Sequence, residues 1–162
     1  SRSLVERISQ ISPVHHGIGR AEALALQNGQ ADSFLPALNL IAAEVVAHGG
    51  DANWSGPDAA RVRRVRDNLE HKRRDDPDFW SVVGLPELSV YEALAARTLH
   101  TELPAILAVY EELYQRAGTA WMWASVANQL GFVLAQHKAG QGEHARAAAE
   151  LLQRLRQYAG LA

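Results

Sequence analysis

Seven histidines are the residues of this chain best suited to metal or acid–base chemistry. His137 and His144 flank one turn of the expected fold, so their imidazoles could meet, and Glu143 stands next to His144. A zinc site needs three or four converging ligands, and the HExxH spacing of zinc-dependent proteases is absent from the sequence. The adjacent His15 and His16 point to different faces. We therefore predict no metal site and interpret the histidines as surface or capping residues.

Carboxylate and nucleophile chemistry has equally little support. The paired acids Asp75-Asp76 and Glu111-Glu112 stand among polar, solvent-facing residues, whereas acid–base catalysis needs two carboxyls in one cleft with separated pKa values. The chain has no cysteine, no GxSxG nucleophile motif and no phosphate-binding glycine loop. We predict a protein that is not an enzyme and uses no cofactor. A small enzyme with an unrecognised site is the weaker alternative.

Positive charge concentrates between residues 58 and 74. The basic side chains of this segment are Arg61, Arg63, Arg64, Arg66, Lys72, Arg73 and Arg74. Acidic residues are interleaved with them, and Glu70 has a basic partner four positions away on each side, at Arg66 and Arg74. The segment offers no aromatic side chain for base stacking, and the net charge of -2 provides no general attraction to nucleic acid or to anionic membranes. We predict a solvated helix face, with no nucleic-acid and no membrane binding.

The elements that must position these side chains are predicted to be helices throughout. Of the 162 residues, 48% are hydrophobic and 21% charged, a composition typical of a globular protein with one domain. Helix-favouring residues are plentiful, and no alternation of period two indicates a strand. The predicted helices span residues 4–11, 14–27, 34–48, 58–74, 79–99, 101–116, 120–137 and 143–158, with a kink or brief break expected at Gly84-Leu85-Pro86.

Three pairs of these predicted helices recur at a spacing of about 40 residues. Asp78-Phe79-Trp80 and Thr119-Ala120-Trp121 are 41 positions apart, and each begins the first helix of a pair. The period is longer than the 34 residues of a tetratricopeptide repeat. We predict an all-α fold, a short α-solenoid of about three tetratricopeptide-like helical hairpins plus N-terminal helices, forming a single domain over residues 1–162.

Two tryptophans, Trp121 and Trp123, stand two positions apart on one predicted helix. Side chains at i and i+2 point about 200° apart, so the two indoles occupy different faces. Trp123 belongs to an apolar face with Val126, Leu130 and Val133. Trp121 shares the other face with Ser125, Asn128 and Phe132, a mixture of aromatic, hydroxyl and amide groups that is our candidate ligand or peptide groove. The alternative is core packing, the usual role of large aromatic side chains.

Three stretches resemble a known family. They are Phe34-Leu35-Pro36-Ala37-Leu38-Asn39, Asp78-Phe79-Trp80 and residues 121–130. Over roughly residues 14–137 the chain is similar to a tetratricopeptide-type signalling domain of bacterial conflict and signalling proteins, which is in turn similar to the TRAF-binding helical region of apoptosis signal-regulating kinases. The resemblance implies a helical, non-enzymatic recognition module beside effector domains, one that senses nucleotide-derived signals or scaffolds assembly. Asn39, Trp80 and Trp121 are the residues that carry over.

These observations lead to one functional expectation and one alternative. We expect a non-enzymatic sensor or scaffold domain of a bacterial signalling protein, which binds a ligand or peptide on its concave face. Its partners would be an effector domain or partner protein and a nucleotide-derived small molecule, with self-association through an exposed end of the array. The alternative is a plain protein–protein adaptor.

The surroundings of the domain are also predicted from the sequence. The chain starts at Ser1 and has its only methionine at Met122, so we expect a domain excised from a longer protein. A composition without cysteine, together with the lack of a signal or membrane-spanning segment, predicts a cytoplasmic location.

Overall fold

The computed structural model describes residues 34–161, and all regular structure in this range is α-helical. The prediction of an all-α fold is confirmed for these residues, while the predicted helices 4–11 and 14–27 lie outside them. None of the described helices carries an apolar stretch long enough to cross a membrane. The helices are α3 (Phe34–Ala47), α4 (Ala59–Asp75), α5 (Phe79–Ala96), α6 (Leu99–Arg116), α7 (Ala120–Lys138) and α8 (Glu143–Tyr158).

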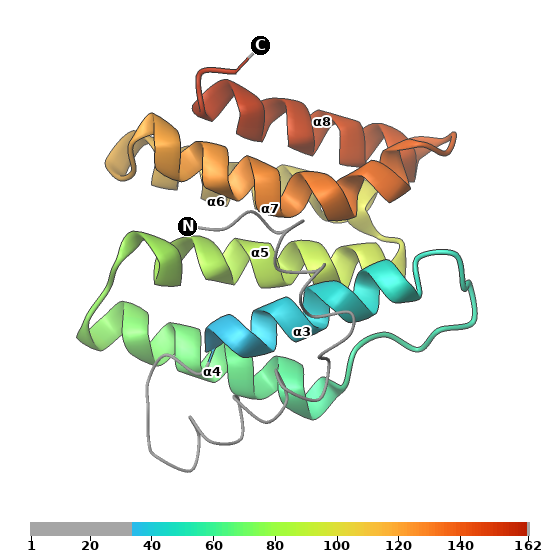
Figure 1. Cartoon of the computed structure of the whole chain (residues 1–162), viewed down its shortest axis with the longest axis horizontal. Helices are drawn as coiled ribbons and strands as arrows, with labels where there is room; N and C mark the ends of the chain where they lie inside the picture. Colours follow the sequence, from blue (N-terminus) through green and yellow to red (C-terminus); the bar gives the residue numbers. More distant parts are fainter. Residues whose placement is uncertain (1–33, 162) are drawn as a thin grey trace.

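Consecutive helices pack as three hairpins, α3–α4, α5–α6 and α7–α8 (Figure 1). The central helix α5 also contacts α3, α4 and α7, and α6 contacts α8. Among the described helices, no Cα atom of α4 lies within 8 Å of α6, and none of α6 lies within 8 Å of α7. Instead α3 contacts α7 directly, so the first hairpin touches the third. A strictly linear array would allow contact only between neighbouring repeats.

Helix α5 begins at a capping box and continues through the expected interruption. The Ser81 amide donates to Asp78 Oδ1 over 2.7 Å, while the Asp78 amide donates to Ser81 Oγ over 3.1 Å. The helix runs through Gly84 and Pro86 without the predicted break. Gly84 allows α4 to approach closely, because a Cβ atom there would lie 2.8 Å from Leu69 Cδ2. Packing in this buried region therefore offsets the helix-breaking tendency of Pro86.

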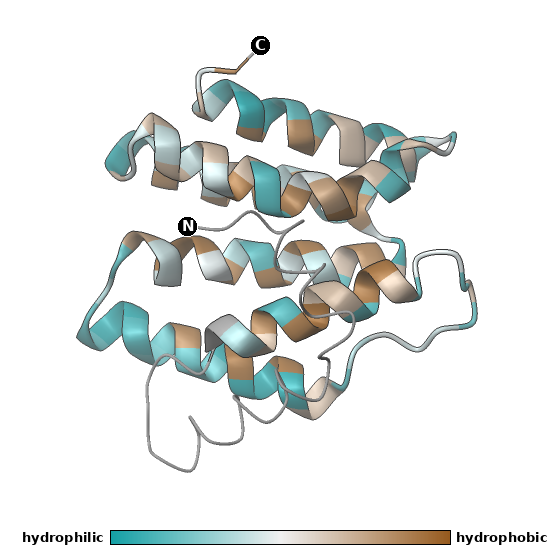
Figure 2. Cartoon of the chain, in the orientation of Figure 1, coloured by the Kyte–Doolittle hydropathy of each residue, from teal (hydrophilic) through white to brown (hydrophobic). Residues whose placement is uncertain are grey.

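The core is made of apolar stripes at helical spacing, which the sequence predicts for α3, α4, α6, α7 and α8 but not for α5. Helix α4 shows the pattern most clearly, since its surface is largely hydrophilic (Figure 2) and only one narrow stripe is buried. Amphipathic helices of this kind are held by tertiary packing more than by intrinsic propensity. The buried members of the predicted stripes are Leu38, Ile41, Ala42, Val45, Val62, Val65, Leu69, Leu103, Ile106, Tyr110, Ala148, Leu151, Leu155 and Ala159.

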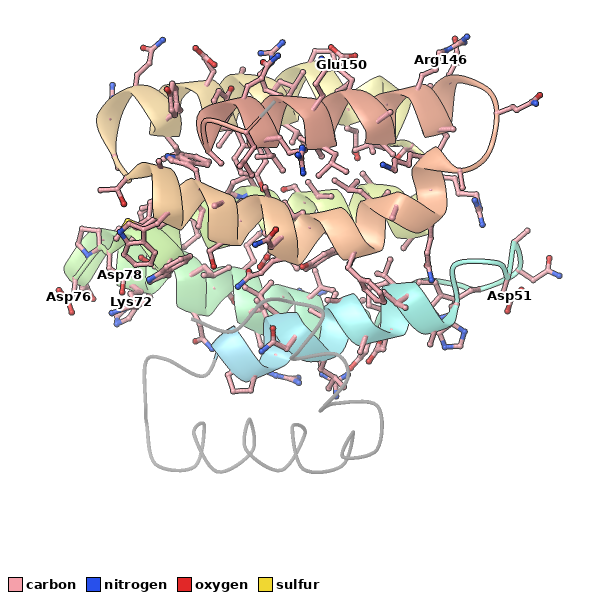
Figure 3. All side chains as sticks on the ribbon, turned by 45° about the horizontal axis from the view of Figure 1, so that its top comes forward. Asp51, Lys72, Asp76, Asp78, Arg146 and Glu150 are labelled. Atoms are coloured by element: carbon pink, nitrogen blue, oxygen red, sulfur yellow. The ribbon has the colours of Figure 1, made fainter. Side chains whose placement is uncertain are left out.

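The helix connections gather at two opposite ends of the bundle (Figure 1). At the end we call the aromatic end, where α5 and α7 begin, the buried Trp123 ring contacts four other rings, those of Phe79, Tyr110, Tyr114 and Tyr158. At the end we call the polar end, the α3–α4, α5–α6 and α7–α8 connections meet around Arg97, His137 and His144. Figure 3 shows Lys72, Asp76 and Asp78 at the aromatic end and Asp51 at the polar end.

Candidate functional site

A groove of about 590 Å³ lies over α5, where α4 and α6 remain apart. A second hollow of about 480 Å³ continues along the same helices and shares Arg66, Glu92 and Glu102 with the first. We call the two together the α4–α6 groove. Apart from those three shared residues, its lining is Trp54, Ser55, Gly56, Pro57, Ala59, Val62, Arg63, Ser89, Ala95, Ala96, Thr98, Thr101, Ala105 and Ile106.

Small side chains explain why this groove is open. The residues of α5 that face it include Ser89, Ala95 and Ala96, and α6 adds Ala105. None of these reaches far enough to fill the space that separates α4 from α6. One rim is formed by Trp54, whose ring stacks on His48 with centroids 4.7 Å apart and planes inclined by 14°. The groove thus has a shallow, small-residue floor and one aromatic boundary.

The two walls of the groove carry opposite charge. On α4, Arg66 forms an ion pair with Glu92 of α5, and Arg63 has no ion pair within the described part of the chain. On α6, Glu102 Oε2 accepts a hydrogen bond of 3.3 Å from Thr98 Oγ1. Glu92 therefore offsets the charge of Arg66, and the remaining charged lining residues are Arg63 on the α4 wall and Glu102 on the α6 wall. An occupant would be oriented by these walls, because complementary charge fixes register more than it adds affinity.

The pairing within the basic segment differs from the pattern expected along a single helix. Arg66 pairs with Glu92 of α5 rather than with Glu70, and Glu70 pairs with Arg73 at 2.6 Å. Arg61 likewise reaches another helix, at Glu44 Oε1 of α3, 2.9 Å away. The interpretation as a purely solvated face is thus incomplete, because two of the arginines tie α4 to its neighbours.

The predicted aromatic and amide face of α7 is only partly present at the surface. Trp121 is 58% exposed and Trp123 fully buried, so the two indoles do separate as their spacing predicts. The Trp121 ring lies 6.3 Å from that of Trp80, centroid to centroid, which brings two predicted site residues together. Asn128 is exposed, but Ser125 between them is buried. The predicted stripe is therefore interrupted.

The remaining candidate, Asn39, is half-buried on α3, and neither Asn39 nor the Trp121 face lines the α4–α6 groove. Trp123 sets the orientation of α7, since its Nε1 donates a 3.1 Å hydrogen bond to the Ala117 carbonyl. With Trp123 anchored in this way, Trp121 must point outward. Its exposure is a consequence of how its neighbour is buried.

His137 and His144 meet as the sequence suggested. His137 Nδ1 lies 2.9 Å from His144 Nε2, across the α7–α8 connection. Burial, the His144 ring and the Arg97 guanidinium lower the pKa of His137 to about 4. Burial, Arg97 and His100 also lower the pKa of His144. The interpretation of these histidines as surface groups is wrong for His137, which is buried.

The histidine pair has limited room around it. A cavity of about 10 Å³, the volume of a single water, adjoins His137 and is also lined by Arg97 and Trp54. Within the part of the chain that the structure describes, no group of three or more His, Asp or Glu side chains is arranged to hold a metal ion. The pair is a buried hydrogen-bonded unit at a helix connection, and neither ring lines the α4–α6 groove.

Comparison of the chain with protein-family models, with curated proteins and with solved structures found no significant match. The resemblance to the tetratricopeptide-type signalling domain therefore stays a prediction. Function must be argued from the geometry of the described residues.

The sequence pattern does not identify the residues that line the α4–α6 groove as a binding site. Arg63 and Arg66 belonged to a segment interpreted as solvated, and Glu102 to a helix start. A usable signal was present in the small residues Ala95, Ala96 and Ala105, which leave gaps when helices pack. Recognising that they face one another requires the tertiary arrangement of α4, α5 and α6.

Proposed function

We propose that the domain is a non-enzymatic recognition module that binds an amphipathic helix of a partner protein in the α4–α6 groove. The observation that carries this proposal is the open space between α4 and α6, floored by small residues and bounded by walls of opposite charge. Helix-in-groove binding uses such a surface, with the occupant's apolar face on the floor and its polar residues at the rims.

The chemistry of the groove specifies the partner helix further. Val62 and Ile106 offer apolar contact on the two sides, while Ala95 and Ala96 let a helix backbone come close. Acidic residues of the occupant would face Arg63, and basic residues would face the acidic α6 wall. In the wider proposal, the module is a scaffold or sensor that brings an effector domain and a partner protein together, the role that the family resemblance implies.

A second candidate function rests on Trp121. An indole that is 58% exposed and adjoins a second tryptophan offers a stacking surface for a planar ligand, such as a nucleotide-derived signal. Stacking of a base on an aromatic side chain contributes about 1–3 kcal/mol. This candidate rests on one flat contact, whereas the α4–α6 groove is lined on three helices, so the groove is the better supported site.

The experiment that tests the groove selects peptides from a random phage-displayed library on the purified domain. Selected peptides are then titrated against Ala96→Trp, which fills the groove, and against Ala149→Trp, which adds the same bulk outside it. Ala149 is exposed on α8 between Arg146 and Glu150, whose side chains point away from the bundle (Figure 3). We expect Kd to rise at least about tenfold in Ala96→Trp and to stay unchanged in Ala149→Trp.

Equal binding to both variants would overturn the groove as the site. Loss of peptide binding in Trp121→Ala alone would move the site to the α7 face. The small-molecule candidate is tested by thermal shift with a nucleotide panel, since a ligand at 100 times its Kd adds about 2.7 kcal/mol of stability. A shift in the parent that disappears in a folded Trp121→Ala variant supports that candidate.

A further inference from the structure

The His137–His144 pair occupies the point where three helix connections meet. His137 lies in the last turn of α7 and His144 in the first turn of α8, and the ring nitrogens that face each other are 2.9 Å apart. Their other ring nitrogens, His137 Nε2 and His144 Nδ1, are buried without a hydrogen-bond partner among the described residues. A buried polar group that is left unsatisfied is costly, so this arrangement calls for a functional explanation.

The short separation constrains the two facing nitrogens. A hydrogen bond between two imidazoles needs one N–H donor and one nitrogen with a free lone pair. A proton on the outer nitrogen of the donor ring would keep this bond but would bury a charged ring whose outer N–H has no partner among the described residues, so the lowered pKa values of both rings favour the neutral pair. Adding one proton to the accepting nitrogen places two N–H groups against each other, and the hydrogen bond is lost.

The charges around the pair make that protonation unfavourable. The guanidinium of Arg97, the C-cap residue of α5, lowers the pKa of both rings, and His100 of α6 lowers the pKa of His144. Glu143 Oε2 lies 3.8 Å from His100 Nε2. On the α3–α4 connection, His48 and Asp51 line the small cavity beside His137. The arginine is close and fixed, since its Nη2 donates to the Gly49 carbonyl over 2.7 Å.

The pair also stands behind one end of the α4–α6 groove. Trp54 and Ala95 line both the small cavity beside His137 and the groove itself. Thr98, which follows Arg97 directly, lines the groove as well. A movement of Arg97 or Trp54 at the polar end must therefore change the shape of the groove.

We infer that the His137–His144 pair is a proton-operated latch that holds the polar end closed, and that its release on acidification reshapes the α4–α6 groove. The first part depends only on the pair and its neighbours. The second part rests on the proposed function of the groove. Release requires that the accepting facing nitrogen takes up a proton from solvent, after which two N–H groups face each other, the rings separate and α8 moves away from Arg97.

The direction of the effect follows from the lowered pKa values. The unfolded chain binds protons at these histidines near pH 6.5, whereas folded His137 binds one only near pH 4, so the unfolded state holds more protons between these values. Stability from the pair is complete above about pH 6.5 and falls as pH decreases toward 4. For His137 alone, the unfolding equilibrium constant rises about 100-fold over this range.

The latch is tested with the double variant His137→Asn and His144→Gln. The amides place hydrogen-bonding groups near the Nδ1 and Nε2 positions, respectively, but do not titrate. We expect urea unfolding of the wild type to lose about 100-fold in equilibrium constant between pH 7 and pH 4 relative to this variant. The control His71→Asn removes an exposed histidine that pairs with Asp75, and should retain the wild-type pH dependence.

Parallel pH dependence of the wild type and the double variant would overturn the latch. If the double variant does not fold, a pH titration of the histidine Hε1 NMR resonances in the wild-type domain still tests the latch. Two histidines that titrate well below pH 6.5 support the latch, and seven that titrate near 6.5 contradict it.

The coupling to the groove has its own readout. The Trp54 indole N–H resonance, assigned through Trp54→Phe, should shift with the titration of the pair in the wild type and not in the double variant. A latch that operates without moving Trp54 would remove the coupling and leave the stability effect in place. Failure of the groove to bind peptides would show in the library experiment and would leave both of these measurements unchanged.

Discussion

The two ends of the bundle are held together by different chemistry. At the aromatic end, the Trp123 ring is fully buried and contacts rings from α5, α6 and α8, including Phe79 at 5.3 Å and Tyr158 at 5.2 Å between centroids. At the polar end, the helix connections are joined by directional contacts that include the His137–His144 hydrogen bond and the bond from Arg97 to the Gly49 carbonyl.

The two kinds of contact respond differently to changes in solution conditions. Contacts between aromatic rings depend on buried area and shape, so they change little with pH or salt. A hydrogen bond between two imidazoles is lost when its accepting nitrogen takes up a proton. The α4–α6 groove opens beside the polar end, where a small change in solution conditions has a structural effect. The packed rings of the aromatic end keep that part of the bundle fixed while the polar end changes.

The largest expected effect is the loss of the aromatic centre. Trp123→Ala should lower the free energy of unfolding by about 4 kcal/mol, because it removes a fully buried indole and leaves a cavity. Trp121→Ala, two residues away on the same helix, should lower it by less than about 1 kcal/mol. Urea unfolding at pH 7 measures both. Similar losses for the two variants would mean that the aromatic end does not centre on Trp123.

A matched pair of glycines compares the connections at the two ends. Gly118, at the aromatic end, has φ 91°, and a Cβ atom there would lie 2.6 Å from Trp123 Nε1 and 2.7 Å from Phe79 Cε2. Gly142, at the polar end, has φ 96° with open space around it. Gly118→Ala should cost about 3 kcal/mol, from backbone strain plus steric overlap, and Gly142→Ala about 1 kcal/mol from strain alone. Equal thermal shifts for the two variants would contradict tight packing at Gly118.

The smallest expected effect concerns a charged hydrogen bond of the aromatic end. Tyr158 donates a hydrogen bond of 2.5 Å to Glu111 Oε2, and burial, followed by that bond, raises its pKa to about 12. Tyr158→Phe should lower the free energy of unfolding by about 1 kcal/mol at pH 7. Because the unfolded tyrosine ionises near pH 10, this contribution is complete below pH 10 and decreases as pH rises toward 12.

The measurement is the difference in unfolding free energy between wild type and Tyr158→Phe at pH 5, 7, 9 and 10.5. A constant difference from pH 5 to 9 would mark the aromatic end as insensitive to acid, in contrast to the polar end. If this difference in unfolding free energy decreased on acidification, the aromatic end would also be sensitive to acid, and the two ends would not differ in this respect.

Much of the fold follows from local sequence pattern, because the spacing of apolar residues indicates which face of a helix is buried. The spacing of Val62, Val65 and Leu69 places one stripe on α4, and the structure buries all three. Helix ends were also well specified, as at Asp78, where a side-chain cap is legible in the sequence. The continuity of α5 through Pro86 was not predictable, since it depends on packing between Gly84 and Leu69.

The candidate site was predicted far less well. The two faces of α7 could be separated from spacing alone, but burial of Ser125 depends on neighbouring helices that the pattern of α7 does not describe. The groove arises from a contact that is not made, between α4 and α6, and local pattern alone does not reveal that the small residues along it face the same space. The histidine pair was visible as a possibility because only a short turn separates the two residues in sequence.

The contact between α3 and α7 has a consequence for how the chain can vary in length. In an open array, a hairpin can be inserted anywhere, because each unit recognises only its neighbours. Here an inserted hairpin between the first and the third would separate two helices that touch, so growth is confined to the outer side of α8 or of α4. The same closure makes folding less sequential, because the first hairpin reaches its final environment only after α7 has formed.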